Sequence, residues 1–174
     1  SLSLQNGRTL TTAGHLNNAG TLELGPSDSF TVGSSASPPS GLVSRWPGNG
    51  NAEDIQGGNH GTLVNGTAFD AGKVGQAFHL DGVNDFVQVP DSPNWAFGNN
   101  PFTIDLWVNF DLIRPGNPYY APNVFIGQDE GPGYINKWAF YHSDSGLTFH
   151  INGPVVGLAF LSAPFAPTVG QWHH

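Results

Sequence analysis

The sequence predicts an all-β protein whose strands form an antiparallel β-sandwich, or jelly roll. The chain has 174 residues, enough for one sandwich domain with a substantial core or for one such domain plus a short appendage. It contains 24 Gly and 14 Pro, and only 10% of its residues are charged, a composition too rich in helix breakers for long helices. Apolar residues also alternate with polar ones between turn signals, as in half-buried strands.

Five stretches carry this period-two alternation clearly. They are residues 77–80, 86–89, 102–108, 139–142 and 147–151. Each stretch predicts a strand of about 4–7 residues, and several short strands at this spacing are typical of a sandwich or jelly roll.

Turn-forming residues join some of these strands. Residues 81–85, with Asp81-Gly82 and Asn84-Asp85, predict a hairpin between the strands at Phe78 and Phe86. Asp, Ser and Gly at 144–146 predict a second hairpin, because these residue types tolerate tight turns. The stretch 109–137 is too broken by Pro and Gly for a long element and predicts a long loop, a kind of loop that is commonly functional.

Composition divides the chain into two parts joined by a linker. Residues 1–33 consist of short apolar stretches separated by Asn and Gly, which resemble the stacked rungs of surface β-helices and adhesin stalks. A two-strand hairpin is the alternative for this segment. Residues 34–41 are small, polar and Pro-containing, which is typical of a linker, so residues 42–174 form the main domain.

Charge and residue content exclude several classes of partner. Five Lys and Arg against thirteen Asp and Glu give a net charge of −8, which leaves no basic patch for nucleic acid or for an anionic membrane. No apolar run approaches the ~18 residues that span a bilayer, so membrane insertion is not expected. The chain has no Cys, and therefore neither a disulfide framework nor a thiol nucleophile.

Six motifs follow one another in a specific order. They are residues 41–54 (GLVSRWPGNGNAED), 57–63 (GGNHGTL), 72–78 (GKVGQAF), 81–87 (DGVNDFV), 102–108 (FTIDLWV) and 170–174 (GQWHH). Across residues 41–174 this series resembles the laminin-G-like (LamG) family of the concanavalin A-like lectin/glucanase superfamily. The resemblance implies a jelly roll of two curved antiparallel sheets, of the kind that secreted bacterial enzymes and surface proteins use for carbohydrate binding or adhesion.

The resemblance also implies two structural features. The tryptophans in strand-like or motif positions are expected in the core; they are Trp46, Trp107, Trp138 and Trp172. In such domains the motif at 171–174 begins a strand that others follow, so the jelly roll is expected to lack its C-terminal strands. The resulting open sheet edge would favour self-association by strand addition.

Oxygen-rich loops are the candidates for a metal site. The loop 54–61 offers the Asp54 carboxylate, the Asn59 amide and Gly-exposed carbonyls, which suit Ca²⁺, and the resemblance implies a structural Ca²⁺ near this position. The alternative is a turn in which Asp54 caps backbone amides. Asp81, Asn84 and Asp85 form a second candidate cluster, for which a plain hairpin turn is the alternative.

Aromatic residues with polar neighbours are the candidates for a ligand site, because sugars stack on exposed aromatic rings. The stretch around residues 117–134 offers such a mixture, and Trp95 is a further candidate. The predicted ligand-binding residues are Tyr119, Tyr120, Asn123, Asp129, Tyr134 and Trp95. Packing of the tyrosines within a turn is the alternative.

Catalysis is not expected. A glycosidase needs two carboxylates about 5–9 Å apart across a cleft, and the Glu-x-Asp-x-x-Glu pattern of the superfamily's glucanases does not occur here. No Gly-x-Ser-x-Gly motif marks an esterase. The sequence therefore favours an extracellular recognition module, secreted or on the cell surface, that binds glycan or a surface protein. The alternatives are a structural subunit of an extracellular fibre or stalk and an accessory domain of a secreted glycosidase.

Overall fold

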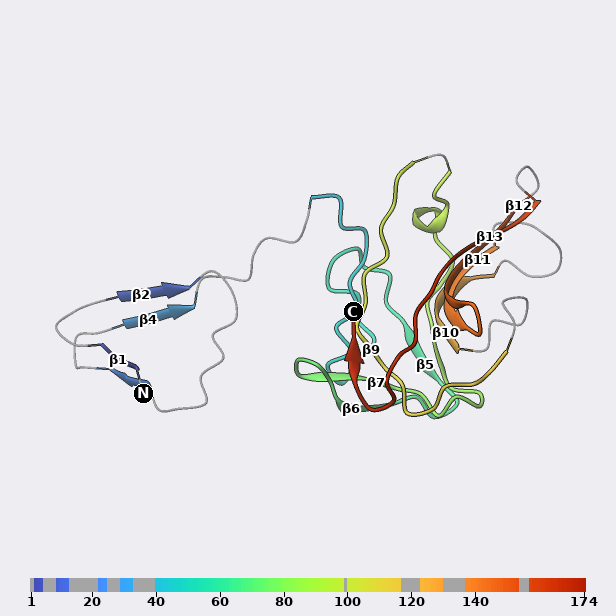
Figure 1. The fold of residues 1–174 in the computed structure, drawn as a ribbon. Coiled ribbons are helices and arrows are strands. Elements are labelled where there is room, and N and C mark those ends of the chain that lie inside the picture. The colour runs from blue at the N-terminus through green and yellow to red at the C-terminus, as the bar shows by residue number, and fades with distance from the viewer. Residues whose placement is uncertain are drawn as a thin grey trace. The chain divides into compact units, whose positions relative to one another are not determined.

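The computed structural model describes residues 2–4, 9–12, 22–24, 29–32, 40–98, 100–116, 123–129, 137–153 and 157–174. The chain divides into two compact units, which we call unit 1 (Ser1–Val43) and unit 2 (Ser44–His174). Apart from one short 3-10 helix, η1 (Pro93–Trp95), every regular element in the described residues is a β-strand (Figure 1). The predicted all-β class is confirmed.

The described residues of unit 1 form four short strands, β1 (Leu2–Leu4), β2 (Thr9–Thr12), β3 (Leu22–Leu24) and β4 (Ser29–Val32). β1 pairs with β3 and β2 pairs with β4, and both pairs are parallel. Parallel strands cannot be joined by a tight hairpin, because the chain must return to the same end before the next strand begins. Both described pairs of unit 1 are parallel, so neither is a hairpin.

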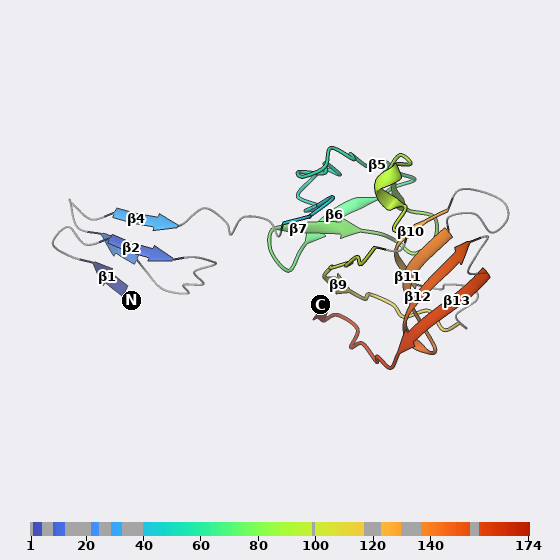
Figure 2. The ribbon, with the colours of Figure 1, turned by 90° about the horizontal axis from the view of Figure 1, so that it is seen from above.

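In the described part of unit 2 there are ten strands, all paired antiparallel. Their bounds are β5 (Thr62–Val64), β6 (Ala68–Ala71), β7 (Gln76–His79), β8 (Phe86–Gln88), β9 (Val108–Asn109), β10 (Asn123–Gln128), β11 (Lys137–Ser143), β12 (Gly146–Gly153), β13 (Gly157–Ala163) and β14 (Trp172–His173). Strands β10 to β13 form one sheet in sequence order, and Figure 2 shows these four strands side by side. The remaining pairs are β5–β8, β6–β7 and β9–β14, an arrangement consistent with the predicted sandwich.

The hairpin predicted at residues 144–146 is confirmed. It joins β11 to β12, with His142 opposite Leu147 and Ser143 opposite Gly146. Gly146 has φ +97°, and a Cβ atom there would clash with the backbone oxygen of Ala163 in β13. Only glycine fits this corner, because it must turn and also let a third strand approach.

Three sequence predictions in unit 2 are wrong in detail. Residues 81–85 do not close a hairpin, because β7 pairs with β6 and β8 pairs with β5, so this turn connects strands of different pairs. The strand predicted at 102–108 is reduced to β9 at its end. The predicted loop 109–137 contains β10, a six-residue strand that pairs with β11 on both sides of an irregularity between Val124 and Ile126.

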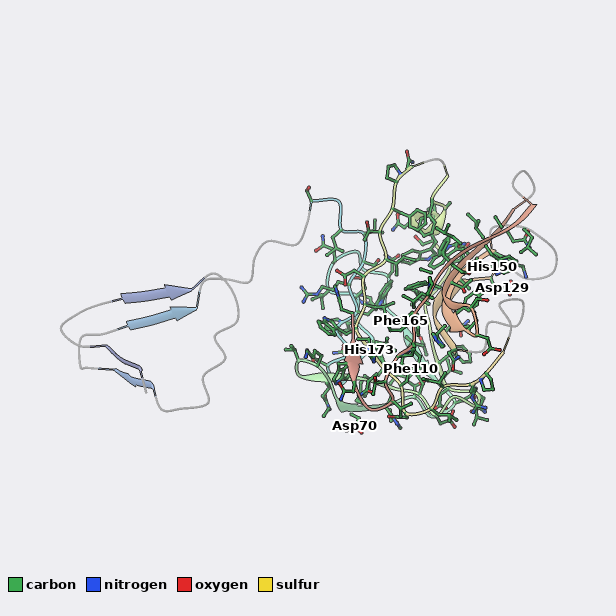
Figure 3. All side chains as sticks on the ribbon, in the orientation of Figure 1. Asp70, Phe110, Asp129, His150, Phe165 and His173 are labelled. Carbon is green, nitrogen blue, oxygen red and sulfur yellow. The ribbon has the colours of Figure 1, made fainter. Side chains whose placement is uncertain are left out.

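The core of unit 2 is aromatic. Trp138 in β11 is only 7% exposed and packs against Phe97 and Phe149, with ring centroids 5.0 and 6.1 Å away. Phe110 is buried after β9 and lies edge-on to Phe125 of β10. Figure 3 labels Phe110 in the middle of this unit, at the level of β9 and β10.

Contacts through His173 tie β14 to this core. Its ring lies 5.4 Å from that of Phe165 and 6.5 Å from that of Phe110, and all three are labelled in Figure 3. Residues 172 and 173, in the motif that was expected to begin a strand, form β14, which pairs antiparallel with β9 within unit 2. The β9–β14 ladder also sets the positions of Trp107, just before β9, and His174, just after β14.

Candidate functional site

Trp107 is not in the core, contrary to the expectation from the family resemblance. Its side chain is 48% exposed, whereas Trp46 and Trp172 are half-buried and Trp138 is buried. The physical reason is the alternation of the segment itself. Ile104, Leu106 and Val108 are half-buried, so the intervening residues Thr103, Asp105 and Trp107 are exposed.

Three polar side chains gather around the exposed indole. The imidazole of His174 lies 4.8 Å from the Trp107 ring, tilted by 38°. Its Nε2 atom is 2.6 Å from Oδ1 of Asp105. The ammonium group of Lys73 lies over the indole, 5.1 Å from the ring centroid, which is within the range of a cation–π contact. We call these four residues the Trp107 cluster.

Three segments position the Trp107 cluster. In the β9–β14 ladder His173 lies opposite Val108, and this places the next residue, His174, beside the preceding one, Trp107. His173 is fixed in turn by its Nε2 atom, 3.1 Å from both the amide and the carbonyl of Thr168. Lys73 comes from the β6–β7 turn, which the Gly72 amide closes by donating to the Gly75 carbonyl.

The Trp107 cluster has the chemistry of a sugar-binding surface. A flat apolar ring suits the C–H face of a pyranose, while a carboxylate, an imidazole and an ammonium group can exchange hydrogen bonds with hydroxyl groups at its edge. Alternation alone could have identified Trp107 and Asp105 as exposed neighbours. No sequence signal joins Lys73 or His174 to them, since strand pairing brings these residues together.

The predicted ligand-binding residues fall into two groups. Tyr119, Tyr120 and Tyr134 lie outside the described residues. The others make contacts within the fold. Asn123 accepts a hydrogen bond from the Arg114 amide and donates to the carbonyls of Arg114 and His142.

The remaining two members of that group are also engaged. Asp129 forms a 2.6 Å ion pair with Lys137. Trp95 is half-buried, packs against Trp46 at 5.7 Å and donates its indole N–H to the Pro90 carbonyl. Trp95 therefore does not present the open aromatic surface that Trp107 does.

Asp54, the first predicted calcium ligand, is a hydrogen-bond hub that is only 3% exposed. Its Oδ1 atom accepts from the amides of Arg45, Gln56 and Gly57 at 2.8, 2.9 and 3.1 Å. Its Oδ2 atom accepts from the amide of Asn59 at 3.0 Å and from the Asn59 side chain at 3.3 Å. Asp54 therefore caps backbone amides, which is one of the two roles that the sequence left open.

These donors control the ionisation of Asp54. Burial alone would raise the pKa of its carboxyl group, but the amides of Arg45, Gln56 and Gly57 outweigh burial and hold the pKa well below the ordinary value. Both oxygens are engaged by N–H groups, so a cation at Asp54 would have to displace donors. The loop geometry fits an amide cap better than a Ca²⁺ ligand set.

The second predicted metal cluster is an exposed turn. Asp81 accepts hydrogen bonds from the amides of Val83 and Asn84, and Asp85 accepts one from the amide of Asp81. The Val83 amide is the main reason that the pKa of Asp81 is lowered. Across the described stretches, no three His, Cys, Asp or Glu side chains are grouped to hold a metal ion.

Calcium binding stays a prediction of the sequence, and it has a direct test. If Ca²⁺ binds the native loop at Asp54, EDTA lowers the melting temperature of the wild-type protein, because a ligand bound only by the native state stabilises it. Asp54→Ala should then abolish the EDTA response, measured as the difference within each variant. An EDTA response that Asp81→Ala abolishes instead would place the ion in the second loop, and no response in the wild type would exclude both.

Comparison with protein families gives one match. A family model described as Laminin_G_3, concanavalin A-like lectin/glucanases superfamily, matches residues 81–174, more than half of the chain. The match includes Asp105, Trp107 and His174 of the Trp107 cluster. No curated protein and no solved structure matches the chain. Among the described residues, no helix has the length and apolar character needed to cross a bilayer.

Proposed function

The chain belongs to the laminin-G-like family of the concanavalin A-like lectin/glucanases superfamily, and on that basis we propose that it binds carbohydrate through the Trp107 cluster. Members of this family are typically extracellular, non-catalytic modules that bind glycans or protein partners. The coarse function is therefore that of a carbohydrate- or partner-binding module. The proposal adds the site, the ligand chemistry and a role in surface recognition.

The observation that carries the proposal is the exposed indole of Trp107 with the polar side chains of Lys73, Asp105 and His174 beside it. Trp107 is 48% exposed in the segment just before β9, which is an unusual position for a large aromatic residue unless it contacts a partner. A sugar ring that covers the open part of the indole removes on the order of 100 Å² of apolar surface from water. At about 25 cal/mol per Å² this stabilises the complex by roughly 2.5 kcal/mol.

Polar contacts would add direction to this stacking. The Asp105 carboxylate can accept hydrogen bonds from sugar hydroxyls, and the Lys73 ammonium, which lies over the indole ring, can donate them. A single site of this kind corresponds to an affinity in the millimolar range, since about 4 kcal/mol of binding free energy gives a Kd near 1 mM.

Charge favours neutral glycans. The chain carries a net charge of −8, so uronic acid polymers and sulfated glycans are repelled at long range. The Trp107 cluster itself combines a carboxylate with basic groups and is not a cationic patch. The proposed ligand is therefore an uncharged oligosaccharide or polysaccharide at a cell surface or in an extracellular matrix.

An array of immobilised oligosaccharides, probed with the full chain, tests the proposal. We expect binding to neutral oligosaccharides in preference to acidic ones of the same length. Binding confined to acidic glycans would overturn the charge argument, and an array without any bound glycan would overturn the proposed function.

A further inference from the structure

The two strand pairs of unit 1 share one constant offset. Leu2 lies opposite Leu22 in the β1–β3 pair and Thr9 lies opposite Ser29 in the β2–β4 pair, so partners are 20 residues apart in both (22 − 2 and 29 − 9). The register matches like residues with like. The matched pairs include Leu2 with Leu22, Leu4 with Leu24, Leu10 with Phe30 and Thr11 with Thr31.

A constant offset in two successive parallel pairs describes stacked coils of a β-solenoid. The first coil contains β1 and β2, and the second contains β3 and β4, which pair with β1 and β2 respectively. In such an architecture each coil contacts only its neighbours, and stacking buries a continuous core. The described strands of unit 1 belong to two such coils.

Both outer edges of this two-coil stack are open within the described residues. β1 and β2 pair on one side only, and so do β3 and β4, as their two-stranded sheets show. Exposed strand edges normally carry Pro, Lys or other blocking residues that prevent pairing with another chain. The four strands read LSL, TLTT, LEL and SFTV, and contain neither Pro nor Lys.

We propose that the second coil of one molecule stacks on the first coil of another copy of this chain, and so continues the 20-residue period between molecules. The contact between β3–β4 of one copy and β1–β2 of the next repeats the ladder that already exists within each copy. The same matches recur across it, with leucine beside leucine and Phe30 beside Leu10. Because the two edges differ, the contact is head-to-tail and does not close, so it builds an open-ended stack.

This stack is independent of glycan binding at the Trp107 cluster, since it uses unit 1 alone. It would nevertheless present the sites of unit 2 in multiple copies, which converts weak individual affinities into avidity. A carbohydrate-binding module with single-site affinity in the millimolar range would gain most from such an array.

Cysteine cross-linking tests the stack, because the chain contains no Cys of its own. Ser3→Cys and Glu23→Cys are prepared as separate variants, mixed at high concentration and oxidised mildly. In the stack, position 23 of one copy lies one strand spacing, about 4.8 Å, from position 3 of the next, within the Cα range of a disulfide. Identical positions are separated by two spacings, roughly 10 Å. We expect the mixed disulfide in the mass spectrum at several times the yield of either homodimer.

Two controls separate failure of the stack from failure of the coil. Val83→Cys, at a position 77% exposed in unit 2, is mixed with Ser3→Cys and gives the yield of random collisions. The double variant Ser3→Cys/Glu23→Cys, oxidised at low concentration, is expected to close within one chain because these residues are register partners. If it closes while the mixed disulfide stays at the collision yield, the stack is wrong. If it does not close, the coil itself is wrong, and the stack with it.

Discussion

Asp54→Ala is expected to lower the free energy of unfolding of unit 2 by about 3 kcal/mol, or roughly 10 °C in melting temperature. The substitution removes the acceptor for the amides of Arg45, Gln56, Gly57 and Asn59. Donors left without a partner in a partly buried loop cost about 1–3 kcal/mol each, less where water reaches them. Chemical denaturation followed by tryptophan fluorescence measures the change.

The same carboxylate predicts a pH dependence. Its folded-state pKa lies below the ordinary value of 3.8, so the ionised form is favoured in the native state. The stabilisation is fully present above about pH 4 and is lost as the pH falls below this value toward the lowered pKa. In Asp54→Asn this part of the acid sensitivity should be absent, and the variant should be less stable than the wild type at pH 7 but less sensitive between pH 4 and pH 2.

Asp81→Ala is the matched control for Asp54→Ala. Asp81 also accepts hydrogen bonds from two backbone amides and also has a lowered pKa, but its turn is exposed to water. Solvent can replace the lost acceptor there, so we expect a much smaller change in the denaturation midpoint. Equal effects of the two substitutions would contradict the role assigned to burial at Asp54.

Trp107→Ala is expected to reduce the affinity for the glycan identified on the array by at least tenfold while leaving the fold intact. Loss of an aromatic anchor at the centre of a binding site typically costs about 2 kcal/mol or more, and 1.4 kcal/mol corresponds to tenfold in Kd. The indole is 48% exposed, so its removal should shift the melting temperature by only a few degrees. Affinity electrophoresis and thermal unfolding measure the two quantities on the same samples.

Trp138→Ala provides the matched tryptophan. Trp138 is 7% exposed, packs against Phe97 and Phe149 and donates its indole N–H to Gln128. Its removal should destabilise unit 2 by about 3–5 kcal/mol, as for a buried aromatic residue. A Trp107→Ala variant that melts as low as Trp138→Ala would show that Trp107 is structural. Unchanged glycan affinity in a folded Trp107→Ala variant would remove it from the binding site.

Local sequence was enough to predict the features that depend only on residues close together in the chain, such as a tight turn or the exposed face of a short segment. The turn at 144–146 formed the predicted hairpin because Asp, Ser and Gly fit a two-residue connection between two strands that pair in register. Alternation at residues 103–108 placed Trp107 on the exposed face, and this local pattern proved more reliable than the resemblance that assigned the residue to the core. The all-β class likewise followed from breakers and alternation, which need no knowledge of partners.

Strand partners were decided only by tertiary structure. The turn at 81–85 has the chemistry of a hairpin, yet β7 pairs with β6 and β8 with β5. Turn residues fix the local backbone but do not specify which edge a strand joins, because that depends on what packs above and below it. β10 was missed for the same reason, since a strand flanked by Pro and Gly is stabilised by its pairing with β11.

The amino-acid sequence by itself thus determined the fold class and one hairpin, and its local alternation agrees with the exposure of Trp107, although the family resemblance had assigned this residue to the core. Only the tertiary structure decided which side chains surround that indole. His174 reaches Asp105 across 69 residues of chain because β9 and β14 pair, and Lys73 arrives from a separate turn. The amide cap at Asp54 likewise depends on the Arg45 amide, nine residues earlier in the chain. The sequences of these segments do not indicate that the segments will meet. Their contacts therefore depend on how the strands pair and pack.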